Sequence, residues 1–385
     1  MSDTPLRTTV LADAHRAAGA RMVAFAGYEM PVQYADGVLK EHLWTRAHAG
    51  AFDVSHMGPA YFRLLHPTGD GDADHAAVCA LFEPLVCGDL KGLKRGQMRY
   101  TLLLNADGGI EDDLMVGRPV LDSAQGMLII VVNAGTKEAD FAAMVAAAGD
   151  VGELIRADEG ALIAVQGPDA AAATATIIPE AADLTFMTLR PLEFEGHRVV
   201  VSRSGYTGED GYEILVPAEL GRPLWDRLLA DDRVRPIGLG ARDSLRLEAG
   251  LPLYGHDLDA TVSPVEAALE FALSKRRLKA ADFPGAARVA AELAGGAARR
   301  RVGLRVLEGA PAREGAEITD AAGQVVGRVT SGGFSPSLSA PIAMGYVPPA
   351  LSKPGTKLGV VVRGKRQAAE VAPLPFVPHR YFRKA

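Results

Sequence analysis

The stretch Asn105–Leu114, NADGGIEDDL, guides the interpretation of the whole chain. It follows a run of strand-forming residues, MRYTLLLN (98–105), and leads into the apolar segment LMVG (114–117). Between the two lies Asp-Gly-Gly at 107–109, a sequence typical of tight turns between paired strands. The pattern predicts a β-hairpin whose second strand carries two adjacent acids, Asp112 and Asp113.

Adjacent acids in a strand are unusual, because aspartate is a poor strand former. Successive side chains leave a strand on opposite faces, so we expect Asp112 and Asp113 to have different environments. An aspartate buried on one face would have a raised pKa and could act as an acid or base near neutral pH. The alternative is that both acids lie in water beside the turn, and the spacing alone leaves it open.

Composition and charge narrow the class of protein. A chain of 385 residues exceeds what one core usually serves, so we expect two or three domains. The net charge of −6 argues against a nucleic-acid-binding protein. The only cysteines, Cys79 and Cys87, make neither a disulfide framework nor a zinc pattern, and we expect both in the core. No signal or transit peptide and no apolar run of ~18 residues occurs, which predicts a cytoplasmic, bacterial protein that does not enter membranes.

The order of the expected elements suggests where the domains divide. Helical and strand-like segments are mixed up to Gly295-Gly296, and short strands with turns follow, typical of a small β-barrel or sandwich. Before that linker, Ser263-Pro264 with Glu266 forms a capping box, which predicts a helix ending in the basic run 275–277.

The segment GLGARDSLRLEAG (238–250) holds a second candidate for function. Arg242 would lie in the first turn of a helix, where the helix dipole disfavours a cation. Residues placed against local preference are often functional, and a guanidinium fork suits a carboxylate or a planar heterocycle. Glu213 ends the glycine-rich loop GYTGEDGYE and could accept two hydrogen bonds from an amino-pyrimidine. The alternative, that Arg242 pairs with Glu213 or a nearby aspartate as a structural bridge, stays open.

Other patterns point away from common cofactors. The chain contains no GxGxxG, P-loop or HExxH motif, so we expect neither a dinucleotide, a flavin nor a metal site. His56, in FDVSHM, is as compatible with a structural histidine at a strand end as with a catalytic one.

Seven blocks in order resemble the T-protein of the glycine cleavage system, a tetrahydrofolate-dependent aminomethyltransferase family. They are GARMVAFAGYEMPVQY, FDVSHMG, NADGGIEDDL, VQGP, SRSGYTGEDGYE, GLGARDSLRLEAGLPLYG and TSGGFSP. The resemblance implies an α+β fold: a three-lobed cloverleaf of two interleaved antiparallel α+β domains and a C-terminal all-β barrel. The implied domains are 1–56 with 157–237, 57–156 with 238–290, and 297–385.

The resemblance also implies the roles of individual residues, with folate in the channel between the lobes. It assigns Asp113 as the catalytic carboxylate, Glu213 and Arg242 to the pteridine, and Tyr100, Asn133, Tyr206 and, near the C-terminus, Tyr381 to the same channel. Glu111 stands where the family often has an apolar residue, and we expect its charge to raise the pKa of Asp113.

The implied reaction passes a one-carbon unit from an aminomethyl-lipoyl group on a carrier protein, the H-protein, to tetrahydrofolate. The products are 5,10-methylenetetrahydrofolate, ammonia and the dihydrolipoyl carrier, and no metal is required. The basic residues at 275–279 and 299–301 are the candidates for carrier docking. Two alternatives share the fold: a folate-dependent demethylase, and a non-enzymatic folate-binding protein of iron–sulfur cluster assembly, whose Lys-Gly-Cys motif is missing here.

Overall fold

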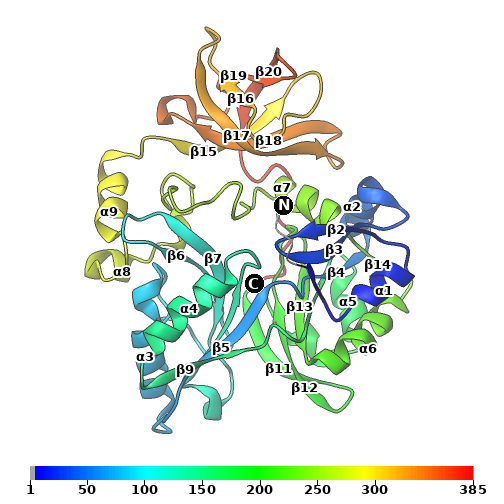
Figure 1. The fold of residues 1–385 in the computed structure, drawn as a ribbon, viewed down its shortest axis with the longest axis vertical. Helices are drawn as coiled ribbons and strands as arrows, with labels where there is room; N and C mark the ends of the chain where they lie inside the picture. The colour runs from blue at the N-terminus through cyan, green and yellow to red at the C-terminus, as the bar shows by residue number, and fades with distance from the viewer. Residues whose placement is uncertain (1–4, 385) are drawn as a thin grey trace.

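The first of two large sheets is assembled from strands that lie far apart in the sequence (Figure 1). The computed structural model describes residues 5–384, and residues 1–4, on which the expected absence of a signal segment partly rests, lie outside it. Neighbouring strands are antiparallel except β4 and β14. In spatial order they are β11 (Thr188–Phe194), β12 (His197–Arg203), β13 (Gly211–Val216), β10 (Ala161–Gln166), β4 (Ala49–Asp53) and β14 (Val234–Pro236).

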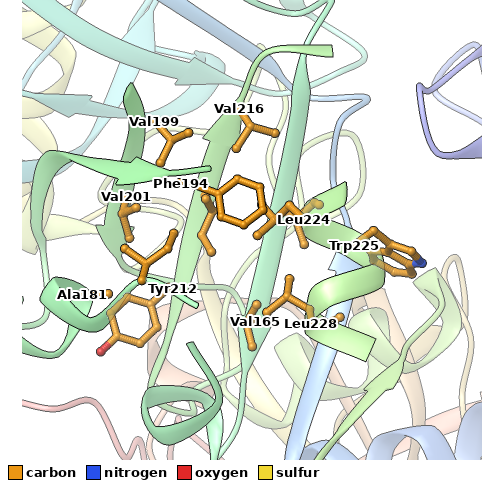
Figure 2. Close-up of a cluster of buried hydrophobic side chains, with 14 of the residues drawn as sticks. Val165, Ala181, Phe194, Val199, Val201, Tyr212, Val216, Leu224, Trp225 and Leu228 are labelled. Carbon is orange, nitrogen blue, oxygen red and sulfur yellow. The ribbon is translucent and has the colours of Figure 1, made fainter. Parts of the chain in front are cut away.

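One helix closes the main core of this sheet. Figure 2 shows Leu224 and Leu228 of α6 (Ala218–Leu229) facing Phe194 and Val165 of the sheet, while Trp225 points to the other side of the helix, where its ring packs on His15 of α1 (Ala12–Ala17). These residues are almost completely buried, and burial of large apolar side chains of this kind is the main stabilising contribution to a lobe. The short helix α5 (Ala170–Ala175) adds Ala170 and Ala173 to the same core.

The second sheet comes from the intervening part of the chain, so the two lobes interleave. Its strands, all antiparallel, are β6 (Met98–Leu104), β7 (Ile110–Gly117), β8 (Met127–Val132), β5 (Gly58–Leu64) and β9 (Gly152–Arg156), in that spatial order. Helices α3 (Gly71–Phe82) and α4 (Lys137–Ala148) supply Val78, Phe82, Phe141 and Met144 to its core. The hairpin expected around NADGGIEDDL is therefore confirmed as β6–β7.

A small sheet and two helices lie beside the first lobe, where α2 (Gly37–Ala47) packs on β4. The sheet consists of β1 (Arg7–Thr8), β3 (Tyr28–Gln33) and β2 (Arg21–Phe25), in that spatial order. Along the chain, α1 lies between β1 and β2, and α2 follows β3. Helix α7 (Leu239–Glu248) packs on α2 and β3 and also contacts strands of the barrel.

The C-terminal lobe is a closed barrel, at the top of Figure 1. Together with the two large sheets, the barrel confirms the expected cloverleaf of two interleaved antiparallel α+β lobes and an all-β barrel. Around the barrel the strands are β15 (Arg300–Val306), β18 (Ala340–Val347), β17 (Val325–Ser335), β16 (Glu317–Thr319), β19 (Lys357–Val362) and β20 (Lys365–Ala372).

The prediction of one helix from Ser263 to the basic run 275–277 is wrong. The capping box forms, since Ser263 N–H donates to Glu266 Oε2 (3.1 Å) and Glu266 N–H donates to Ser263 Oγ (3.0 Å). The chain then leaves the helical path at Ala268, whose φ of 56° is left-handed. A single 3₁₀ turn (Glu270–Ala272) follows, and the basic residues begin α8 (Lys275–Ala280) rather than end a helix; α9 (Ala286–Gly295) comes next.

Two further expectations concern buried thiols and membranes. Cys79 and Cys87 are free and fully buried, as expected for core residues. Within residues 5–384, no helix combines the length and the apolar character needed to cross a membrane.

Candidate active site

The β6–β7 hairpin places its two acids at different depths. Along β7 the side chains alternate between buried and half-buried, and Asp112 is fully buried while Asp113 is half-buried. Asp113 lies opposite Leu102 of β6, and a bulge at Glu111 shifts the register just before the acids. The expectation that both acids lie in a strand is confirmed, and the alternative that both lie in water is wrong.

Asn133, directly after β8, contacts both acids. Its Nδ2 donates to Asp113 Oδ1 and to Asp112 Oδ1, both at 2.8 Å, and its backbone N–H donates to Asp112 Oδ2 at 3.0 Å. Tyr100 on β6 donates its hydroxyl proton to Asp113 Oδ2 at 3.0 Å. The two acids differ in burial, as expected for opposite faces of the strand, but they share a hydrogen-bond partner that was not expected.

Burial makes Asp113 suitable for proton exchange near neutral pH. Burial and, after it, the charge of Asp112 raise the pKa of Asp113 to about 7, although the hydrogen bonds from Tyr100 and Asn133 act in the opposite direction. We expected Glu111 to supply the neighbouring like charge. Instead, Glu111 Oε1 accepts a hydrogen bond from Asn105 Nδ2 (3.0 Å), and the like charge beside Asp113 is that of Asp112.

Arg242 presents part of its guanidinium without a protein partner. It lies in the first turn of α7, after Gly238 at the N-cap. Its Nη1 is buried and donates no hydrogen bond to any acceptor within residues 5–384. Glu213 on β13 lies close enough that its charge opposes the lowering of the pKa of Arg242 by burial, but the two form no ion pair. Ser204 Oγ donates to Glu213 Oε2 at 2.8 Å and orients this carboxylate. The alternative of a structural Arg242–Glu213 ion pair is therefore not observed.

Tyr206 lies between these two groups of residues. The guanidinium carbon of Arg242 is 5.0 Å from the centre of the Tyr206 ring, and the Tyr206 hydroxyl donates to Pro252 O. Burial raises the pKa of Tyr206, and the charges of Asp113 and Arg242 both act on it. Tyr206 is therefore within electrostatic range of both ends of the candidate site.

Tyr381 has different neighbours. Its ring stacks on Phe186, with centroids 4.0 Å apart, and tilts against His379 at 4.9 Å. It lines a hollow of about 410 Å³ together with Glu209, Asp210 and Arg380. Among the described contacts, no hydrogen bond or ring contact joins Tyr381 to the other predicted site residues.

The basic residues considered for carrier docking are largely engaged within the chain. Arg299 pairs with Glu266 (3.1 Å) and Arg300 with Glu270 (2.6 Å), while Arg301 is buried. Arg276 pairs with Glu83 and Asp89, and Arg277 is fully buried beside Glu83. These contacts account for the arginines of both segments, whereas Lys275 and Lys279 are exposed, and the docking face of the carrier stays unassigned.

Two residues near the site, Asp140 and Phe271, were missed from the sequence, and the role of a third, His56, was left open. Asp140 of α4 is buried within electrostatic range of Asp112. Phe271 stacks on Tyr100 with centroids 5.7 Å apart and is 73% exposed. His56 is buried with an unpartnered Nδ1, and burial lowers its pKa to about 4, so its ring is neutral. The sequence offered one signal, the acid Asp140 in the first turn of a helix, which ordinary dipole preference already explains.

Comparisons with known proteins agree with this arrangement along the whole chain. Residues 11–277 match the GCVT N-terminal domain model, and residues 299–378 match the glycine cleavage T-protein C-terminal barrel domain. The mitochondrial aminomethyltransferase of Canis lupus familiaris is 45% identical, covering 98% of this chain and 91% of the relative, and that of Flaveria pringlei is 41% identical, covering 100% and 93%.

A solved structure extends the comparison to the fold. The glycine cleavage system aminomethyltransferase T of Bartonella henselae superposes with a TM-score of 0.89 at 42% identity, covering 98% of this chain and 100% of that one. None of these relatives favours the demethylase or the iron–sulfur assembly protein. The chain therefore belongs to the glycine cleavage T-protein family and is an aminomethyltransferase.

Proposed function

We propose that this aminomethyltransferase takes its one-carbon unit from an aminomethyl-lipoyl group on the H-protein and passes it to tetrahydrofolate, with Asp113 as the catalytic carboxyl. One observation carries the assignment of Asp113. Its carboxyl has a raised pKa and accepts hydrogen bonds from Tyr100 and Asn133. Among residues 5–384 it pairs with no cation that would hold it permanently ionised.

The transfer requires protons to move but needs no oxidant or reductant. The carbon loses its bonds to the ammonia nitrogen and the lipoyl sulfur and gains bonds to two nitrogens of tetrahydrofolate. The two protons lost from those nitrogens end on ammonia and on the dihydrolipoyl thiol. Asp113, which exchanges its proton near pH 7, suits the role of holding or relaying one of them. Tyr100 and Asn133 hold the carboxyl in place, so little reorientation is needed during the transfer.

Arg242 and Glu213 suit the pteridine ring. An amino-pyrimidine edge offers N–H donors to a carboxylate and acceptors to a guanidinium, and these two side chains supply both without neutralising each other. The unpartnered Nη1 of Arg242 supports this role, since a buried donor without an acceptor is costly unless a ligand supplies one. We also propose that Tyr206 and Asn133 line the same channel, and that Tyr381 contacts the substrate.

The proposal also covers the bounds of the domains and the cellular location of the protein. We propose domains 1–56 with 157–237, 57–156 with 238–290, and 297–385, in agreement with the alternation of the two large sheets along the chain. The cytoplasmic location stays a prediction, since the relatives named above are mitochondrial.

The decisive experiment compares two isosteric variants. Asp113→Asn keeps the shape of the carboxyl and removes its basicity, so kcat with aminomethylated H-protein should fall on the order of 10²–10⁴-fold. Folate affinity should change much less, because other residues hold the ring. Asp112→Asn is the matched variant, and we expect its loss to be smaller and to appear mainly in the melting temperature.

Two results would contradict the proposal. The first is an Asp113→Asn enzyme with turnover within about threefold of wild type, far below a general acid or base contribution. The second is wild-type protein that is inactive with the aminomethylated carrier but demethylates small methylated amines.

A further inference from the structure

The start of helix α7, which carries Arg242, is held by a carboxylate from another helix. Glu41 of α2 is 2% exposed, and its Oε2 accepts a hydrogen bond from the backbone N–H of Gly238 at 2.8 Å. Its Oε1 accepts a second one from the backbone N–H of Tyr34, directly after β3, at 2.6 Å. One buried carboxylate therefore ties the end of β3 to the start of α7.

Helix α7 has no acid or capping side chain of its own at this end. The first N–H groups of a helix lack partners within it, and a polar N-cap side chain or an acid in the first turn usually compensates them. The N-cap of α7 is Gly238, which has no side chain, and its first turn contains no acid. The same turn contains Arg242, a cation where the helix dipole favours an anion. Glu41 supplies from α2 the negative charge that the sequence of α7 lacks.

Gly238 passes this constraint on to Arg242. The carbonyl of Gly238 accepts a hydrogen bond from the backbone N–H of Arg242 at 3.1 Å. A Cβ at Gly238 would lie 2.4 Å from the carbonyl oxygen of Val32, so this residue is pressed against β3. Gly238 is thus held through its N–H by Glu41 and bonded through its carbonyl to Arg242. The point from which the Arg242 side chain extends therefore depends on Glu41.

Glu41 makes no ion pair within residues 5–384, unlike Glu248 of α7, which pairs with Arg46 and His42. Arg235, which lines the same small hollow as Glu41, pairs with Asp36 instead. A buried carboxylate without a cation is costly unless hydrogen bonds compensate it. The only donors that compensate Glu41 among the described residues are the two backbone N–H groups, so its placement serves to hold these two segments together.

We propose that Glu41 is a positioning residue of the pteridine site, which fixes the first turn of α7 and thereby sets where the guanidinium of Arg242 meets the ring. The proposal rests on the proposed role of Arg242 in binding the pteridine. Glu41 acts through Arg242 and not on the ligand itself. Its contribution to affinity should therefore disappear once the Arg242 side chain is removed.

The test is a double-mutant cycle on the full-length protein, with tetrahydrofolate affinity measured by titration calorimetry. Glu41→Met keeps much of the length of the side chain and removes its charge and both acceptor oxygens. Alone, it should weaken binding roughly three- to thirtyfold, the range for coupled neighbours. Added to Arg242→Ala, it should change the affinity by no more than about twofold, as expected when the interaction is already lost.

Asp74 of α3 provides the matched control. It is 3% exposed, and its carboxylate accepts hydrogen bonds from the backbone N–H groups of Thr68 (2.7 Å) and Gly69 (2.9 Å) in the second lobe. Asp74→Leu likewise removes a buried acid that binds backbone. It should lower the melting temperature and leave the tetrahydrofolate affinity within about twofold of wild type, since changes at distant sites act independently.

The outcomes separate this proposal from the proposed role of Arg242. If Arg242→Ala alone leaves the affinity unchanged, the pteridine role of Arg242 falls and the positioning role falls with it. If Arg242→Ala weakens binding, the positioning role alone is overturned by any of three results: unchanged affinity in Glu41→Met, an equal loss in Asp74→Leu, or a loss that recurs in full in the double variant. If Glu41→Met does not fold, Glu41→Gln, which keeps one acceptor oxygen and no charge, takes its place in the cycle under the same criteria.

Discussion

Arg242 and Arg246 lie one turn apart on α7, and their surroundings differ sharply. Arg246 is held by Asp243 and Asp257, both at 2.7 Å, and by Ser331 Oγ of the barrel at 2.9 Å. Arg242 makes no such contact and keeps one buried nitrogen unpartnered. The same residue type is therefore structural at one position and available to a ligand at the other.

This difference predicts opposite consequences for two alanine variants. Arg242→Ala should weaken tetrahydrofolate binding by roughly 1.5–3 kcal/mol, the contribution of hydrogen bonds to a charged group, with little effect on unfolding. Arg246→Ala should mainly lower the melting temperature, because it leaves Asp257 buried and unpaired. Titration calorimetry and thermal unfolding measure both, and Glu213→Ala provides a second loss of affinity. Unchanged affinity in both Arg242→Ala and Glu213→Ala would remove these residues from the site.

Asp113 should also make stability depend on pH in a definite direction. Its folded pKa of about 7 exceeds the ordinary value of about 3.9, so the stabilising effect of its proton is complete below about pH 4 and is lost as pH rises through about 7. The asparagine of Asp113→Asn cannot ionise, so the variant does not lose this stability as pH rises. Compared with wild type, the variant should therefore be more stable at about pH 8.5 than at about pH 5.5, by on the order of 1–2 kcal/mol. Denaturant unfolding at the two pH values measures this, and an equal difference at both would show that Asp113 has an ordinary pKa in the folded protein.

The β6–β7 hairpin acts as one element, because its tip is fixed against a distant loop. A Cβ on Gly109 would lie 1.7 Å from Ala260 O, so the hairpin approaches that loop as closely as only glycine permits. Ile110 N–H donates to Val262 O at 3.0 Å in the same loop. The acids of β7 therefore depend on a contact with a segment about 150 residues away in sequence.

Gly109→Ala should displace the hairpin and its acids together. We expect a loss of about 1–3 kcal/mol in the free energy of unfolding, typical of overpacking, together with reduced turnover. Gly135→Ala is the matched control, because a Cβ there meets no atom within 4 Å and its backbone is not left-handed. Thermal unfolding and turnover should be compared for both variants, and equal melting temperatures would mean that the hairpin tip can move without cost.

On the scale of the whole molecule, Glu248 at the end of α7 connects two lobes. It accepts hydrogen bonds from His42 (3.1 Å) and Arg46 (2.9 Å) of α2, and from Ser335 (2.6 Å) and Ser337 (2.7 Å) of the barrel. Burial opposes its charge, yet these donors, His42 first, hold its pKa down to about 2. This buried carboxylate, together with the bond from Arg246 to Ser331, thus attaches the barrel to the helix that carries Arg242.

A depressed pKa predicts a stabilisation that acid removes. Glu248 stabilises the fold above its unfolded pKa of about 4.3, and this contribution disappears as pH falls toward about 2. Glu248→Gln should therefore cost about 3–5 kcal/mol at pH 7, as expected when one partner of a buried charge network is removed. Denaturant unfolding at about pH 7 and about pH 3 should show a smaller difference between variant and wild type at the lower pH, and a difference that does not depend on pH would contradict the role of its charge.

The sequence by itself determined the local structure and much of the candidate site. The turn at 107–109, the alternation along β7, the first-turn position of Arg242 and the change to short strands after Gly295-Gly296 all follow from interactions between residues a few positions apart. Such interactions act on propensity and periodicity, which are visible in the chain itself. The resemblance to the family added the cloverleaf, which no local pattern specifies.

Only the tertiary structure decided which charges are free and which are held. It showed that Asn133 reaches both acids, that Arg246 is bound while Arg242 is not, and that the expected helix after Ser263 breaks at Ala268. Each depends on desolvation or on a contact between distant segments, such as Glu248 with Ser335, 87 positions apart. The free energy of a charge depends on every group that surrounds it after folding, and a linear sequence does not specify those neighbours.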